Sequence, residues 1–120
     1  MSARRLMAAF ALVAAVVGIT ASSVLAARSQ TQKTTIRVSA LDTLKFKLSA
    51  TRAPHGTVVF IVTNTGSIKH DFSIAGKKTI QLGHNKSATL TVTLRKGRYP
   101  YKCTVDGHAA AGMKGTFTAT

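Results

Sequence analysis

"SATLTVTL", residues 87–94, alternates apolar side chains with threonines. Alternation with a period of two predicts a β-strand that has one buried face and one solvent-exposed face. The stretch "TLKFKLSA", residues 43–50, repeats the pattern, with Lys45 and Lys47 on the exposed side. The residues expected to point inward are Leu44, Phe46, Leu48, Ala88, Leu90, Val92 and Leu94.

Other stretches of the chain extend this β pattern. "TVVFIVTN", residues 57–64, is almost continuously apolar, which fits a central strand. Turn signals recur about every eight to twelve residues, and no helical period is present after residue 34, so we expect a β-sandwich or β-barrel. Pro100 interrupts the strand predicted over residues 98–103, which places it at a sheet edge or at a bulge.

The N-terminus has the features of a secretory signal peptide. Arg4 and Arg5 precede an apolar run, which is followed by small residues up to Ala26. We therefore expect a signal peptide at residues 1–26, a flexible linker at 27–33 and one domain at 34–120. An uncleaved membrane anchor is the alternative. In either case the domain is expected to be periplasmic or secreted.

The chain is strongly basic, with 17 Lys and Arg against 3 acidic residues. Removal of the signal peptide leaves a net charge of about +12. This charge favours acidic partners and allows a weak contact with an anionic membrane surface. The export signal and the few aromatic residues argue against nucleic acid as a ligand, because stacking platforms are absent.

Cys103 is the only cysteine of the chain. A single thiol in an exported protein cannot form an internal disulfide and is exposed to oxidation, so we expect it to be buried or ligated. His108 and Met113 follow it in a C-x4-H-x4-M pattern, and Gly107 and Gly112 allow the loop between them to turn tightly. Thiolate and thioether are soft metal ligands, and imidazole suits copper, zinc or iron.

A blue copper site needs a second histidine beside one cysteine, one histidine and a weak axial methionine. The candidates are His55, His70 and His84. His55 and His84 lie in predicted turns, whereas His70 lies where a predicted loop meets a strand. On the residues alone, a ligand role and a surface role for His70 are equally well supported, and Cys103 by itself is most simply a buried inert thiol.

The stretches "GTVVFIVTNTG", "KHDFSI", "SATLTVTL", "GRYPYKC" and "CTVDGHAAAGMKGTFT" resemble the cupredoxins, the small type 1 blue copper proteins that include plastocyanin, azurin and auracyanin. The resemblance covers nearly all of residues 34–120. It implies a Greek-key β-sandwich or barrel of about seven to eight strands that binds one copper ion. The implied ligands are His70, Cys103, His108 and an axial Met113.

The resemblance also implies two features around these ligands. Asp71, next to His70, is expected to tie the two ligand loops together through Thr104, with its own backbone amide directed at the sulfur of Cys103. Asp106 departs from the family, where proline is common, and adds a negative charge near the expected metal.

The implied function is electron transfer outside the cytoplasm by a monomer that is not an enzyme. Copper would cycle between Cu(I) and Cu(II), and an acidic redox partner protein would dock at the patch formed by His108 and residues 109–111. Lys69, Lys102 and Lys114 would surround this patch. The alternatives are a periplasmic copper storage or delivery protein, and a metal-free module whose basic surface binds an anionic polymer or lipid.

Overall fold

A computed structural model describes residues 33–120, so the predicted signal peptide and the linker up to residue 32 lie outside the described residues. No helix in the described part has the length and hydropathy to cross a membrane. The strands of this part are β1 (Lys33–Leu41), β2 (Lys45–Leu48), β3 (Arg52–Ala53), β4 (Gly56–Asn64), β5 (Ser73–Ile74), β6 (Lys77–Lys78), β7 (Ser87–Leu94), β8 (Gly97–Lys102) and β9 (Lys114–Ala119).

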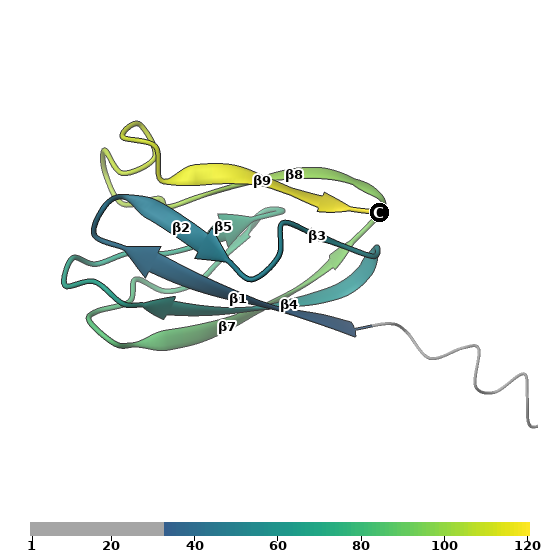
Figure 1. The fold of residues 1–120 in the computed structure, drawn as a ribbon, viewed down its shortest axis with the longest axis horizontal. Helices are drawn as coiled ribbons and strands as arrows, with labels where there is room; N and C mark the ends of the chain where they lie inside the picture. Colours follow the sequence, from purple (N-terminus) through teal and green to yellow (C-terminus); the bar gives the residue numbers. More distant parts are fainter. Residues whose placement is uncertain (1–32) are drawn as a thin grey trace, which may run out of the picture. The chain divides into compact units, whose positions relative to one another are not determined.

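The strands form two sheets, in the orders β2-β1-β4-β7 and β3-β9-β8-β5-β6 (Figure 1). β1 pairs in parallel with β4, and β3 in parallel with β9, while the other pairs are antiparallel. The predicted all-β sandwich is confirmed. The described residues form nine strands where about seven to eight were expected, and three of the nine, β3, β5 and β6, have only two residues each.

Burial follows the alternation read from the sequence. In β7, Leu90, Val92 and Leu94 are buried while the threonines between them are exposed. In β2, the lysines are exposed and Phe46 and Leu48 are half-buried. β4 lies between β1 and β7, as its continuous apolar run predicts.

The core lies between the two sheets and is rich in aromatic rings. Phe60 of β4 contacts Phe117 of β9, with ring centroids 5.3 Å apart, and Phe72, with centroids 5.2 Å apart. All three rings are completely buried. Close packing of large rings from both sheets makes a stiff framework, because interiors packed at this density deform little.

Pro100 lies in β8, which is inside its sheet and not at an edge. Its register with β9 is continuous, so no bulge is present. β5, however, pairs only with Tyr101 and Lys102, so Pro100 has no strand beside it on that side. The missing amide hydrogen therefore costs the sheet no ladder hydrogen bond there.

Three connections meet at one end of the sandwich, opposite the C-terminus (Figure 1). These are the β1–β2 turn, the β4–β5 connection and the β8–β9 loop. The amide of Ser67, in the β4–β5 connection, donates to the carboxylate of Asp42 in the β1–β2 turn. The amide of Thr104, in the β8–β9 loop, donates to the carboxylate of Asp71 in the β4–β5 connection. The predicted ligands all lie at this end.

Candidate metal centre

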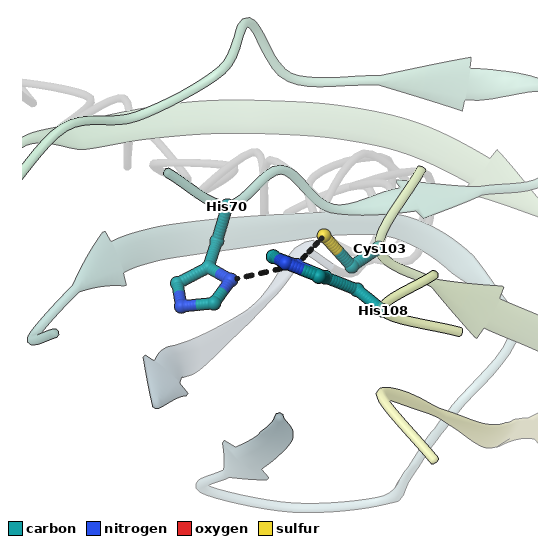
Figure 2. A group of neighbouring side chains, drawn as sticks. All are labelled: His70, Cys103 and His108. Carbon is teal, nitrogen blue, oxygen red and sulfur yellow. Dashed lines mark hydrogen bonds between the residues drawn. The ribbon is translucent and has the colours of Figure 1, made fainter. Parts of the chain in front are cut away.

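His70, Cys103 and His108 converge at the joined end of the sandwich (Figure 2). One donor atom of each residue lies within 4.8 Å of the other two. The Nδ1 atoms of the two histidines are 3.3 Å apart, and Sγ of Cys103 is 3.5 Å from Nδ1 of His108. His70 and Cys103 are buried, whereas His108 is partly exposed.

The backbone around His70 is fixed from two sides. His70 and Leu82 form an isolated β-bridge, in which the amide of Leu82 donates to the carbonyl of His70 at 2.7 Å. Asn64, which is completely buried, donates through Nδ2 to the carbonyls of Ile68 and Leu82, each at 2.7 Å. The His70 side chain therefore starts from a backbone that is held by hydrogen bonds, although it follows a loop.

The β8–β9 loop carries the other two members of the cluster. It turns at Gly107 and Gly112, whose φ angles of 78° and 110° favour glycine, as the sequence predicts. The amide of Met113 donates to the carbonyl of His108 at 3.0 Å, and the amide of Cys103 donates to the carbonyl of Met113 at 3.1 Å. These bonds close the loop and bring all three predicted donors of the motif to one place.

The side chain of Met113 is completely buried. It packs with Ala40 and Cys103 in a small apolar cluster that is separate from the main core, with Leu44 and Phe46 at its border. The structure therefore packs the last residue of the C-x4-H-x4-M pattern against the first.

Asp71 joins the two loops that carry the predicted ligands, as the family resemblance implies. Its Oδ1 accepts a hydrogen bond from the amide of Thr104 at 2.6 Å, and its Oδ2 accepts from the hydroxyl of the same residue. Burial raises the pKa of the Cys103 thiol, and hydrogen bonds from the backbone amides of Asp71 and Val105 act against this rise.

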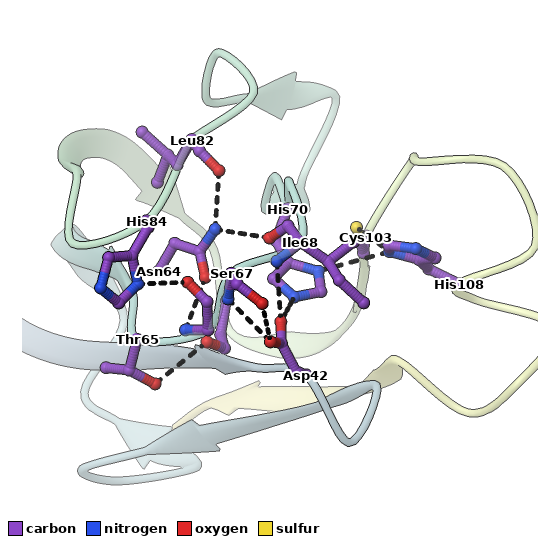
Figure 3. Close-up of polar contacts among 12 residues, drawn as sticks. Asp42, Asn64, Thr65, Ser67, Ile68, His70, Leu82, His84, Cys103 and His108 are labelled. Carbon is purple, nitrogen blue, oxygen red and sulfur yellow. Dashed lines mark hydrogen bonds and ion pairs between the residues drawn. The ribbon is translucent and has the colours of Figure 1, made fainter.

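Asp42, in the β1–β2 turn, belongs to the site although no motif indicates it (Figure 3). Its Oδ1 lies 3.2 Å from Nε2 of His70, on the opposite side of the ring from the donor cluster. The amides of Ser67 and Ile68 and the hydroxyl of Ser67 also donate to this carboxylate, and they hold the pKa of Asp42 far below its usual range. A turn aspartate is too common a feature for sequence patterns to identify it as a partner of His70.

His55 and His84 lie outside the cluster and are exposed, as predicted for turn residues. Nδ1 of His55 is 2.8 Å from the carbonyl oxygen of Thr120, and Nδ1 of His84 is 2.8 Å from that of Gly66. Each of these histidines therefore connects its turn to a distant part of the chain. Of the three candidates for the second imidazole, the structure brings only His70 to Cys103 and His108.

Comparison with known families agrees with this geometry. A model of the cupredoxin-like domain matches residues 9–119. The chain belongs to the cupredoxin-like family.

Solved cupredoxins share the fold at low sequence identity. An auracyanin from Roseiflexus castenholzii has a TM-score of 0.63 and 23% identity, with 76% of this chain and 99% of that chain covered. Rusticyanin from Thiobacillus ferrooxidans has a TM-score of 0.64 and 21% identity, with 76% and 79% covered. These likenesses show the cupredoxin fold of the chain.

One curated relative is the copper-resistant cuproprotein CopI of Vibrio cholerae. It is 32% identical over 93 residues, which cover 58% of this chain and 54% of that protein. The chain therefore spans about half the length of the curated relative that it matches.

The donor set of this cupredoxin fits copper. Two imidazoles and one thiolate, with a thioether beside them, are the donors of a type 1 copper site, in which the thioether is a weak axial ligand. The structure supplies both imidazoles and the thiol within one cluster and packs Met113 against Cys103. A hard cation such as Mg²⁺ would instead need oxygen donors, which the cluster itself lacks.

Proposed function

We propose that this cupredoxin transfers electrons outside the cytoplasm with one type 1 copper ion, held by His70, Cys103, His108 and Met113. The observation that carries the proposal is the convergence of His70, Cys103 and His108 from two separate connections. Bound copper would supply a one-electron couple between Cu(I) and Cu(II). The two sheets and the bonds between the loops hold the donors in place, which suits a site that must accept both oxidation states.

The same donor set supports a carrier role and not an enzymatic one. A catalytic metal site keeps a coordination position open for water or substrate. Here, three donors and an adjacent thioether all come from the protein, and three of the four residues are buried. The cluster therefore offers a substrate no obvious place to bind.

His108 is the ring through which a partner can reach the site. His70 is completely buried, whereas His108 is partly exposed and is followed by Ala109, Ala110 and Ala111. Side chains as small as alanine at these positions would allow a second protein to approach the ring closely. Close approach matters because electron transfer becomes slower as the distance between redox centres increases.

Positive charge around this surface supports an acidic redox partner. Lys69, Lys102 and Lys114 are exposed, and Nζ of Lys45 lies close to Gly112 in the β8–β9 loop. Asp71 is buried and bonded to Thr104, whereas Asp106 is exposed and offsets one of these positive charges. Complementary charge steers encounter and weakens as salt is added.

The decisive experiment is a visible spectrum of residues 27–120 with added Cu(II), before and after ascorbate. We expect an intense thiolate-to-copper band at roughly 600 nm that disappears on reduction. Cys103→Ser should lack the band, while His84→Ala, a change outside the cluster, should keep it. A blue band that survives in the Cys103→Ser protein would refute the thiolate assignment.

Copper storage or delivery is the second candidate, favoured by the identity with a copper-resistant cuproprotein. The two functions differ in what leaves the protein. An electron carrier keeps its copper and exchanges electrons rapidly between its own oxidised and reduced forms. A delivery protein loses Cu(I) to a chelator of moderate affinity and exchanges electrons slowly, so a chelator competition and a self-exchange measurement separate the two.

Export is part of the proposal and is supported by the pattern at residues 1–26 and by the low reactivity that burial gives a lone thiol. N-terminal sequencing of the protein from a periplasmic fraction tests it. An N-terminus at Ala27 would support cleavage, whereas an intact N-terminus in the membrane fraction would support the anchor.

A further inference from the structure

Asp42 contacts the ligand ring of His70 from outside the donor cluster. Its Oδ1 lies 3.2 Å from Nε2 of His70, while Nδ1 of the same ring lies 3.3 Å from Nδ1 of His108 (Figure 3). The ring is completely buried, and about a third of the Asp42 side chain is exposed. One nitrogen of His70 therefore faces the donors and the other faces a carboxylate.

This arrangement determines which nitrogen of the His70 ring carries the proton. An ionised carboxylate can only accept hydrogen bonds, so Nε2 must be the nitrogen that donates to Asp42. In the neutral ring Nδ1 then has no proton, and its lone pair points towards His108 and Cys103. That is the form of the ring that a metal ion requires, because metal ligands must be deprotonated at the binding atom.

The carboxylate is itself held in place. Ser67 donates to Oδ2 from its amide at 2.7 Å and from its hydroxyl at 2.8 Å, and the amide of Ile68 donates to Oδ1 at 3.1 Å. The contact with Gly66 is so close that a Cβ atom there would lie 2.0 Å from Oδ1. Asp42 can hold the ring because its own position is fixed by the loop that precedes His70.

We propose that Asp42 is a positioning residue for His70, which fixes the Nε2-protonated form of the ring and makes it a more electron-donating ligand. This inference rests on the proposed copper site. Loss of a carboxylate that accepts from the second nitrogen of a ligand histidine typically costs about 10–100-fold in metal affinity. A more electron-donating ligand favours Cu(II) over Cu(I), so Asp42 lowers the reduction potential.

The first test determines directly which nitrogen of His70 carries the proton. Long-range ¹H–¹⁵N correlation spectra of the imidazole rings, recorded on the metal-free protein and on the Cu(I) form, should show His70 protonated at Nε2. In the metal-free protein the proton between the two rings then belongs to Nδ1 of His108. A His70 protonated at Nδ1 would overturn the proposal, and the metal-free spectrum gives this answer even if copper does not bind.

The second test uses Asp42→Asn, which preserves shape and removes the charge. We expect a higher reduction potential and about 10–100-fold weaker Cu(II) binding. If Cu(II) loses tenfold more affinity than Cu(I), the potential rises by about 59 mV. The matched control is Tyr99→Phe, which removes a side-chain hydrogen bond to the carbonyl of Arg95, outside the network of Asp42 and His70.

The two variants distinguish positioning from general stability. The proposal is supported if Asp42→Asn raises the potential and Tyr99→Phe leaves it close to the wild-type value. It is overturned if both variants retain the wild-type potential, or if both shift it equally. An absence of any blue copper form in the wild-type protein would instead count against the proposed function.

Discussion

A hydrogen-bonded pair, Asp71 and Thr104, connects the segment of His70 to the segment of Cys103. Asp71 directly follows His70, and Thr104 directly follows Cys103. The carboxylate accepts from the amide of Thr104 at 2.6 Å and from its hydroxyl. Because each residue is the direct neighbour of a predicted ligand, the pair fixes the distance between the two segments that carry these predicted ligands, 33 residues apart in sequence. Both partners are protein groups other than the predicted ligands, so the link should stabilise this end of the sandwich whether or not copper is bound.

Loss of the Thr104 hydroxyl should therefore weaken the metal-free protein. We expect Thr104→Val to lower the free energy of unfolding by about 1.5–3 kcal/mol, the usual contribution of a hydrogen bond to a charged group. Asp71→Ala should lower the free energy of unfolding further, because the amide of Thr104 also loses its acceptor. Urea unfolding of the metal-free proteins measures both changes, and Thr116→Val, at an exposed position of β9, is the control. Equal stability of Thr104→Val and Thr116→Val would contradict the role of the link.

Met113 should set the reduction potential without being essential for copper binding. We expect Met113→Leu, which conserves volume, to raise the potential, because Cu(II) loses a donor. Met113→Gln should lower it, because an oxygen donor is harder and favours Cu(II). Protein-film voltammetry with copper quantification measures both effects. Complete loss of copper from either variant, or potentials identical to the wild type, would contradict a weak axial role.

Much of the fold could be predicted from local patterns. The alternation in residues 87–94 and 43–50 depends only on which face of a strand is buried, and the structure confirms it in β7 and β2. Pro100 shows the limit of such reasoning. A proline removes a ladder hydrogen bond only where a neighbouring strand lies beside it. β5 does not extend as far as Pro100, and nothing in the sequence of β8 indicates where β5 ends.

The candidate site also combines residues that the sequence predicts with one that it does not. Cys103, His108 and Met113 are close in sequence, so their spacing alone predicts that one loop brings them together. His70 needed the family resemblance, because its distance from Cys103 is set by strand pairing. Asp42 lies 28 residues before His70, and only the packing of the β1–β2 turn against the β4–β5 connection brings them into contact. No local pattern encodes that packing.

Gly115 marks a close approach inside the sheet that carries the site. A Cβ atom at this position would lie 2.3 Å from the hydroxyl oxygen of Tyr101 and 2.4 Å from its Cζ. The ring cannot move away easily, because it packs against Phe46 and Phe72. Gly115→Ala should therefore lower the free energy of unfolding by about 1–3 kcal/mol, the usual cost of overpacking. Thermal unfolding with Gly83→Ala as control, where a Cβ meets open space, measures this effect; equal stabilities would show that the ring yields freely.

Lys102 and Lys114 lie directly opposite each other in β8 and β9, next to Cys103 and Met113. Like charges at paired positions of an antiparallel sheet are destabilising, whereas opposite charges contribute about 0.2–1 kcal/mol. Retaining two lysines here therefore costs stability, and a docking role for the surface would explain why the charge is present. Lys114→Glu should consequently increase the free energy of unfolding while it slows electron transfer to an anionic partner.

The kinetic part of this prediction uses reduced protein and ferricyanide as the anionic oxidant, over a range of salt concentrations. We expect Lys114→Glu to react more slowly than the wild type at low salt and to show a smaller salt dependence, because less positive charge lies near His108. Lys96→Glu makes the same change of net charge next to Gly97, where β8 begins at the opposite end from Cys103. If both variants slow the reaction equally, net charge alone governs the encounter, and the surface around His108 is not the docking site.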